Sequence, residues 1–258
     1  MPAAPIEPSP TPRRTLASWL ALVGLCLAVI AVLVALSSGP GYRLGLWHFR
    51  TGLLVLLPAA FWAALAAAAL SLLGLLLSKG ARNTLVMGVL GLVLGLGLAY
   101  VPWSWKRTLD SLPYIHDITT DTQNPPQFVA AAKLRQAGDH PVDYDGPEVA
   151  AQQQKAYPDL APFDTPTPRE QVYKAAKAAI AALGMKLTDD NPAEGRLEAT
   201  YTSLFFGFTD DMVVRVESRP EGTRVDVRSK SRVGRSDLGQ NAKRIRAFLE
   251  QLRAGLKS

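Results

Sequence analysis

The chain contains 258 residues, and 28 basic against 22 acidic side chains give it a net charge of +6. Its single cysteine, Cys26, excludes a disulfide within the chain and a metal site built of thiolates. The charge is unevenly distributed, since only six basic residues and one acidic residue precede residue 106. We therefore expect an apolar membrane region followed by a water-soluble region.

The N-terminal part is dominated by three long uncharged segments. A polar, proline-rich tail over residues 1–15 is expected to be disordered. The region 16–105 then contains uncharged runs of 21, 27 and 22 residues: Leu16–Leu36, Thr51–Leu77 and Thr84–Trp105. Each run is long enough to cross the ~30 Å hydrocarbon core of a bilayer. The sequence thus predicts a membrane α-helical region of three transmembrane helices.

The third predicted helix carries small residues at spacings of three and four: Gly88, Gly91, Gly95 and Ala99. This spacing places them on one helix face, where another backbone can approach closely. The expected partner is an alanine-rich face of the second helix: Ala59, Ala63, Ala66 and Ala67. We favour packing within one chain over homodimerisation through Gly91 and Gly95.

Positively charged residues near the helix ends are evenly divided between the two sides of the membrane. Four lie on each side: Arg13, Arg14, Lys79 and Arg82 on one, and Arg43, Arg50, Lys106 and Arg107 on the other. The first helix usually dominates the orientation, and the Arg13–Arg14 pair directly precedes it. We therefore expect a multi-pass protein of the cytoplasmic (inner) membrane with a cytoplasmic N-terminus and a periplasmic or otherwise extracytoplasmic soluble part. The three runs contain no Asp, Glu, Lys, Arg or His side chain, which argues against ion or proton transport.

Residues 106–164 show little periodicity apart from a short helical pattern over 148–155. We expect an extended linker segment that packs on the soluble domain.

Residues 165–258 alternate between helical and strand patterns in the order α-β-β-β-β-α. A capping box over Thr167–Glu170 opens the first helix, with Pro168 at the first helical position. Strand patterns follow at 185–188, 196–202, 212–216 and 225–227, and a helix over 238–254 closes the chain. The strands have one apolar and one charged face, which is typical of a half-solvated antiparallel sheet. We predict a two-layer α+β domain with both helices on the apolar face.

The basic turn before the last helix is the leading candidate site. Residues 223–258 carry ten basic and three acidic side chains, whereas residues 106–222 carry a net charge of −6. A helix N-terminus beside arginines can bind an anion. The predicted ligand-binding residues are Arg232 and Arg235 as anion contacts, Ser236 and Asn241 as hydrogen-bond donors, and Asp237 as the helix cap.

A purely structural role is the alternative for the same turn. In that case Ser236 or Asp237 only caps the helix, and the arginines pair with the carboxylates of Asp210 and Asp211. A carboxylate at the cap would itself occupy the positive end of the helix.

A histidine and several carboxylates form a second group of candidates: His116, Asp117, Asp121, Asp210 and Asp211. If they converge, they would supply acid–base or metal chemistry, and the protein would be a hydrolase or a metal-dependent enzyme. Their spacing matches no specific ligand motif, so turns and surface ion pairs are the favoured explanation. No catalytic residue, metal or cofactor is predicted.

The aromatic residues Phe205, Phe206 and Phe208 support a third hypothesis. They would line a groove for an apolar ligand if the protein is a lipid carrier, or rest on a lipid surface. We favour a simpler role in which the rings plug one end of the sheet.

Several motifs follow one another between residues 110 and 252: His116–Thr122 with Asn124–Pro126, Asn191–Ala199, Gly207–Asp211, Arg224–Ser229 and Ser231–Gly239. In these motifs the chain resembles an uncharacterised bacterial family, the domain of unknown function number fourteen ninety-nine. The resemblance implies no established activity and therefore assigns no catalytic residue. It also implies an N-terminal membrane segment, which members of that family often carry.

These features predict an uncharacterised, non-enzymatic protein of the bacterial cell envelope that is anchored in the lipid bilayer. Its soluble domain is expected to bind an envelope protein, or a small anionic molecule or lipid, through the basic turn. A nucleic-acid partner is not expected, because the basic run lacks interleaved aromatic residues.

Overall fold

The computed structural model describes residues 15–257, and the chain divides into two compact units after Lys106. Residues 15–106 form the helical unit, and residues 107–257 form the C-terminal domain. Apart from Thr15, the tail predicted to be disordered lies outside the described residues.

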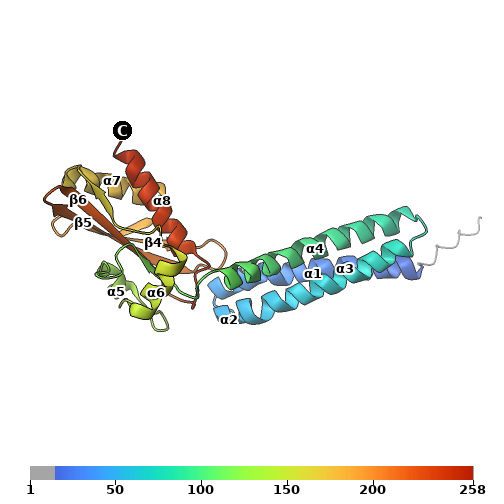
Figure 1. The fold of residues 1–258 in the computed structure, drawn as a ribbon. Helices are drawn as coiled ribbons and strands as arrows, with labels where there is room; N and C mark the ends of the chain where they lie inside the picture. The colour runs from blue at the N-terminus through green and yellow to red at the C-terminus, as the bar shows by residue number, and fades with distance from the viewer. Residues whose placement is uncertain (1–14, 258) are drawn as a thin grey trace, which may run out of the picture. The chain divides into compact units, whose positions relative to one another are not determined.

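The helical unit contains three long apolar helices, which Figure 1 labels α1, α3 and α4. Its elements are α1 (Leu16–Arg43), α2 (Phe49–Thr51), the π-helical turn η1 (Gly52–Leu56), α3 (Leu57–Leu76) and α4 (Arg82–Ser111). Because α2, η1 and α3 run on without a break, the stretches that can cross a membrane are Leu16–Arg43, Phe49–Leu76 and Arg82–Thr108. Their length and composition confirm the prediction of three apolar helices long enough to span a bilayer.

The glycine face of α4 packs on α3, as predicted. A Cβ atom built on Gly95 would lie 2.6 Å from the carbonyl oxygen of Ala64, so only glycine permits this approach. The prediction of which face of α3 is buried is wrong, however, because the buried residues are offset by one position from the predicted ones. The buried small residues are Ala60, Ala64, Ala67, Ala68, Ser71 and Gly74, and only Ala67 belongs to the predicted set. In a run of alanine and leucine, no polar side chain marks which face turns inward.

The C-terminal domain is built on an antiparallel sheet with strand order β1-β6-β5-β4-β3, and β2 also pairs with β6. The strands are β1 (Asp117–Thr119), β2 (Phe163–Thr165), β3 (Lys186–Asn191), β4 (Arg196–Thr202), β5 (Thr209–Arg219) and β6 (Gly222–Ser231). The helices are α5 (Ala130–Leu134), α6 (Pro147–Ala156), α7 (Arg169–Ala182) and α8 (Gln240–Gly255). The predicted order α-β-β-β-β-α is thus confirmed as α7-β3-β4-β5-β6-α8, and β1 and β2 widen the sheet beyond β6.

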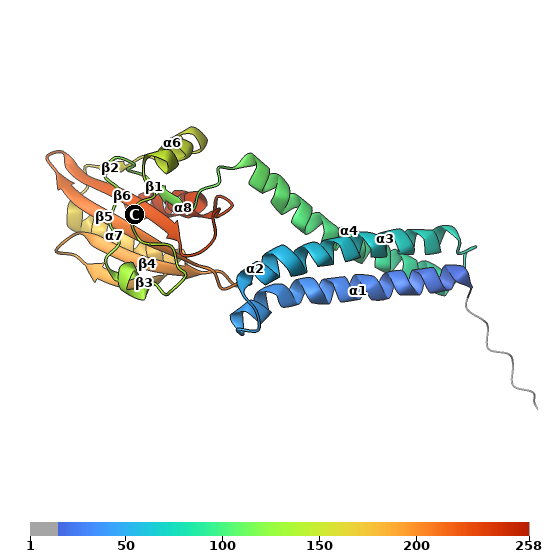
Figure 2. The same ribbon diagram turned by 90° about the horizontal axis from the view of Figure 1, so that it is seen from below.

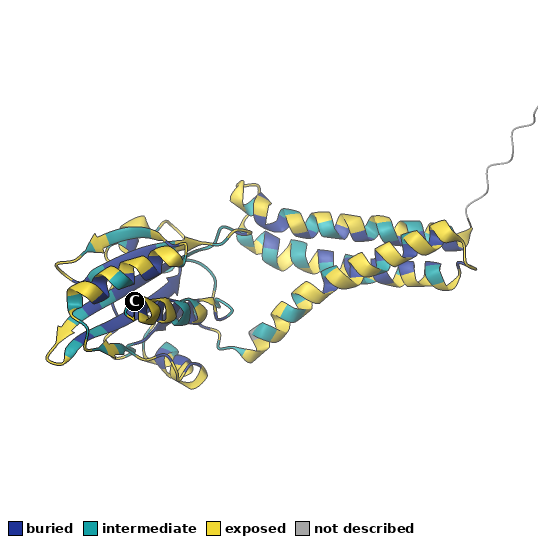
Figure 3. Ribbon diagram, turned by 90° about the horizontal axis from the view of Figure 1, so that it is seen from above, coloured by how far each residue is buried: buried dark blue, intermediate teal, exposed yellow. Residues whose placement is uncertain are grey.

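The main hydrophobic core lies between the sheet and helices α7 and α8. Figure 2 shows both helices against the strands, and Figure 3 shows buried strands beneath helices whose outer faces are exposed. Fully or almost fully buried apolar residues of this core include Val172, Ile180, Leu197, Val214, Val227, Ile245, Phe248 and Leu252. Burial of side chains of this size contributes about 1.5–3 kcal/mol each. This core fixes which face of the sheet the helices cover.

The opposite, charged face of the sheet is not solvated, which corrects the prediction of a half-solvated sheet. Six of its charged residues are at most 1% exposed: Asp117, Glu198, Asp211, Asp226, Arg228 and Lys230. The chain between β1 and α6 covers this face. The Glu198 carboxylate, for example, accepts three backbone N–H bonds of 2.6, 3.0 and 2.8 Å from residues 129–131 at the start of α5. Buried charges persist because each is paired or hydrogen-bonded in this way.

One predicted cap is also corrected. Pro168 itself stands at the N-cap of α7, with no side-chain hydrogen bond, while Glu170 pairs with Lys174 instead of closing a capping box. The predicted C-terminal stop is confirmed, since Gly184 adopts a left-handed φ of 66°.

Candidate functional site

The basic turn, residues 232–239, joins β6 to α8 and contains three residues with positive φ. They are Gly234 at 91°, Leu238 at 54° and Gly239 at 75°. A left-handed conformation is costly for a side chain such as that of Leu238, so surrounding contacts must impose it. The helix begins at Gln240, two residues later than predicted, because this bend separates it from the turn.

Gly239 stands at the N-cap of α8, and the side chain of Asp237, two residues before it, reaches N–H groups at the start of the helix. Its two carboxylate oxygens accept the backbone N–H bonds of Gly239 at 2.8 Å and Asn241 at 2.7 Å. Burial raises the pKa of the Asp237 carboxyl, and these two hydrogen bonds oppose that rise. A carboxylate therefore already occupies the positive end of the helix, where the predicted anion would bind.

Arg232 is held by carboxylates of the domain itself. It donates two hydrogen bonds, of 3.0 and 2.9 Å, to the buried Asp211 carboxylate and a third, of 3.0 Å, to the backbone oxygen of Leu134. Arg135 approaches the same carboxylate within 3.0 Å. The structural alternative for Arg232 therefore describes the geometry better than its predicted role as an anion contact.

Asn241 is fully buried and cannot reach a ligand, so its predicted role is wrong. Its side chain accepts a 2.7 Å bond from the hydroxyl of Ser229 and donates to the hydroxyl of Ser231 and the backbone oxygen of His116. Ser236 is partly exposed, and its hydroxyl accepts a 3.3 Å bond from the Leu238 N–H.

Arg235 is the part of the predicted site that remains available. It is exposed, and within residues 15–257 no carboxylate or hydrogen-bond partner contacts it. Six of the ten basic residues after position 222 are paired with carboxylates: Arg224, Arg228, Lys230, Arg232, Arg244 and Arg246. Five of these six pair mainly with acidic residues from 106–222. Residues 223–258, which carry a net charge of +7, therefore do not form an equally positive surface.

A fully buried ion cluster lies on the sheet next to the basic turn. Asp117 accepts bonds of 2.9 and 2.8 Å from Arg228 and lies 3.1 Å from the Lys230 ammonium, and all three side chains are 0% exposed. The Arg228 guanidinium is flanked by the rings of Phe128 and Tyr144, at 4.9 and 5.3 Å. Burial raises the pKa of the Tyr144 hydroxyl to about 12. The cluster fixes β1 and the covering segment on β6.

A pair of stacked histidines, His116 and His140, contacts the outer side of the turn. Their ring centroids are 4.1 Å apart, and Nε2 of His140 lies 2.8 Å from the backbone oxygen of Gly234. Nε2 of His116 lies 3.5 Å from an Asp145 oxygen. Burial, followed by the neighbouring His140, lowers the pKa of His116. No local sequence signal marks His140 and Asp145, because they lie in a segment without periodicity.

The carboxylates predicted as a second site are held apart by separate cations. Asp121 binds Arg215 and Arg224, whereas Asp210 binds Arg244 at 2.7 Å. Asp210 and Asp211 lie in β5 and not in a turn as predicted. Successive side chains of a strand point to opposite faces, so this pair cannot share a proton or a cation. Within residues 15–257, no group of three or more His, Cys, Asp or Glu side chains is placed to hold a metal ion.

The predicted aromatic group lies in the loop between β4 and β5. Phe206 stacks on Phe208, with centroids 5.0 Å apart, and Phe205 meets Phe206 edge-on at 5.1 Å. The rings therefore pack against one another, with Phe206 buried and Phe205 exposed by 37%.

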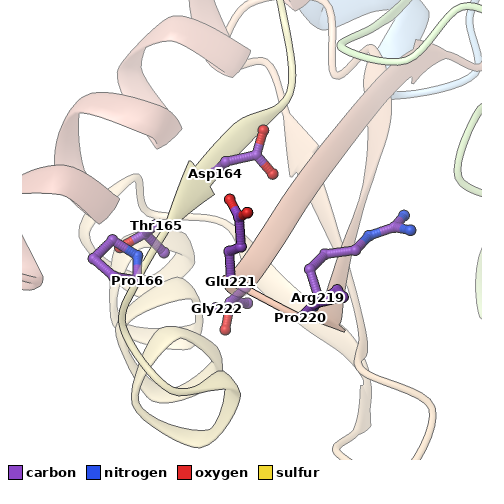
Figure 4. Close-up of a pocket in the computed structure, with 8 residues that line it drawn as sticks. Asp164, Thr165, Pro166, Arg219, Pro220, Glu221 and Gly222 are labelled. Carbon is purple, nitrogen blue, oxygen red and sulfur yellow. The ribbon is translucent and has the colours of Figure 1, made fainter.

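An open hollow of about 430 Å³ lies at the opposite end of β5 and β6 from the basic turn. Figure 4 shows the carboxylates of Asp164 and Glu221 pointing toward one another across it, while Arg219 points away. Its lining is acidic, so this hollow does not belong to the predicted anion site.

The chain thus defines a class of protein: three apolar helices able to span a membrane, followed by an α+β domain with one helix-covered and one ion-paired sheet face. Residues 117–252, more than half of the chain, match the family described as Protein of unknown function (DUF1499). The chain belongs to this family, as the motifs predicted. No match was found among the curated proteins with which the chain was compared.

Proposed function

We propose that the protein is a membrane-anchored envelope protein whose C-terminal domain binds an anionic group through Arg235. The observation that supports this proposal is the contrast between Arg235 and its neighbours. Arg232 forms an ion pair with Asp211, and Arg244 forms one with Asp210. Arg235, in contrast, is exposed on a turn that is hydrogen-bonded to Asp237 and His140. A planar guanidinium on a fixed turn is suited to a carboxylate or phosphate group of a small molecule or a protein partner.

Binding to Arg235 can be tested with inorganic phosphate as the probe. We expect the ¹⁵N side-chain resonance of Arg235, in the full chain in detergent micelles, to shift saturably with phosphate at constant ionic strength. Arg235→Ala should weaken phosphate binding about tenfold or more, because a charge-assisted hydrogen bond contributes ~1.5–3 kcal/mol. Lys133→Ala removes another exposed cation, on α5, and should leave binding unchanged. Equal phosphate affinity in the Arg235→Ala and unmodified proteins would contradict the proposal.

We further propose that the N-terminus lies in the cytoplasm and the C-terminal domain outside the cytoplasmic membrane. The Arg13–Arg14 pair before the first span supports this orientation. A cysteine introduced by Glu221→Cys in a Cys26→Ala background should react with a membrane-impermeant maleimide in intact spheroplasts. Reaction only after the spheroplasts are lysed would reverse the proposed orientation.

A further inference from the structure

The loop between β4 and β5, residues 203–208, is a tight and internally bonded turn that we call the aromatic loop. The Ser203 N–H donates to the oxygen of Phe208 at 2.8 Å, and the Phe208 N–H returns a 2.9 Å bond to the Ser203 hydroxyl. Gly207 supplies the left-handed φ of 71° that the turn requires. The loop therefore presents its side chains on a fixed backbone.

The side chains at the tip of the aromatic loop are apolar and exposed. Leu204 is 88% exposed and Phe205 is 37% exposed, although the stacked ring of Phe206 beneath them is buried. No charged residue occurs between Glu198 and Asp210. Large apolar side chains grouped at a rigid, uncharged tip indicate an interaction surface.

The aromatic loop lies at the end of the sheet where the chain enters from α4. The Arg232 N–H donates to the oxygen of Thr209, directly after the loop, at 3.0 Å. In the same region the Ser231 and Asp237 N–H groups donate to the oxygens of His116 and Ile115. Ile115 follows the last apolar span, Arg82–Thr108, by only a few residues. Chain connectivity thus keeps this end of the domain within reach of any bilayer that the span crosses.

Two exposed cationic side chains follow β6 at this end of the domain. They are Arg235 in the basic turn and Lys243 in the first turn of α8, whereas Arg244, whose guanidinium lies 5.0 Å from the ring centroid of Tyr201, is paired with Asp210. An apolar tip with cations behind it fits the boundary between acyl chains and anionic headgroups.

We propose that the aromatic loop inserts Leu204 and Phe205 into the lipid interface of the bilayer that holds the three apolar helices. A lipid surface is the occupant that this geometry favours, because the chain itself holds the bilayer near the loop and the cations complement anionic headgroups. The inference goes beyond the anion site at Arg235, since it concerns the apolar side chains of a different loop.

The depth of the loop can be measured with a nitroxide at position 204, made by Leu204→Cys in a Cys26→Ala background. The full chain would be placed in nanodiscs of zwitterionic and anionic phospholipids. The control is the same label after Glu221→Cys, in the exposed turn at the other end of β5 and β6. Molecular oxygen concentrates in the lipid, whereas a nickel chelate remains in the water. The ratio of their accessibilities to the nitroxide therefore reports whether the label lies in lipid. We expect the ratio of oxygen to nickel accessibility to be several-fold higher at 204 than at 221.

A ratio at 204 equal to that at 221 would place the loop in water and overturn the proposal. Protection of the label at 204 from both reagents would overturn it as well, because a protein surface or a second copy would then cover the loop. Leu204 is exposed, so its substitution removes no core packing, and an unchanged unfolding transition verifies this. Phosphate binding at Arg235 is measured separately, from its own side-chain resonance, which separates failure of this proposal from failure of the anion site.

Discussion

Replacing Asp117 with alanine is expected to destabilise the C-terminal domain by about 3–5 kcal/mol. The substitution leaves the cations of Arg228 and Lys230 buried at 0% exposure without the carboxylate that both contact. Lys230 keeps the Asp145 carboxylate at 2.6 Å, but Arg228 keeps only the carbonyl oxygens of Pro126 and Val142, which carry no full charge. The cost is large because neither cation can reach water.

Pulse proteolysis of the full chain in urea and detergent measures this change in the free energy of unfolding. Asp159→Ala is the matched control, since it removes a carboxylate from an exposed pair with Arg246. Such pairs contribute less than about 1 kcal/mol. If Asp117→Ala costs no more than Asp159→Ala, the buried cluster does not stabilise the domain as argued.

Replacing Gly95 with leucine is expected to destabilise the helical unit by roughly 3 kcal/mol. The first atom of the new side chain would lie 2.6 Å from the backbone oxygen of Ala64 and 3.0 Å from the backbone nitrogen of Ala68. Backbone atoms inside a helix cannot move aside, so α4 must separate from α3. Titration of the micelle-bound protein with sodium dodecyl sulfate, followed by tryptophan fluorescence, measures the loss.

Gly97 lies on the same helix and provides the control. No atom lies within 4 Å of a Cβ built there, so Gly97→Leu should change the stability by about 0.5 kcal/mol or less. Equal effects of the two substitutions would mean that helix propensity, and not close packing of α4 on α3, determines the result.

The strongly periodic elements were predictable from local sequence. Helix α7, strand β4 and the turn between β5 and β6 appear where the hydrophobic spacing and turn residues place them. Strands β1 and β2 were not predictable, because each is three residues long and shows no periodicity. Their pairing is instead fixed by partners far along the chain, as with Asp117 opposite Lys230.

The candidate site was predictable only in part. The hydrogen bonds of Asp237 at the start of α8 follow from local chemistry, since a short acidic side chain just before a helix readily accepts N–H bonds there. Burial of Asn241 and pairing of Arg232 with Asp211 depend on long-range packing. Arg232, Asp237 and Asn241 lie in one basic run, and the local sequence does not show which of them is buried, paired or exposed.

The amino-acid sequence by itself determined the division into an apolar and a charged half, the three apolar helices, the core α+β order and the family. All of these depend on composition, on spacing within about 20 residues, or on motifs read directly from the chain. Only the tertiary structure decided which carboxylate each cation meets, which face of α3 is buried, and that the charged face of the sheet is covered. The physical reason is that charged and small side chains are compatible with either a solvated or a buried position. Which position a side chain takes depends on partners that only folding brings together, as when the start of α5 covers Glu198.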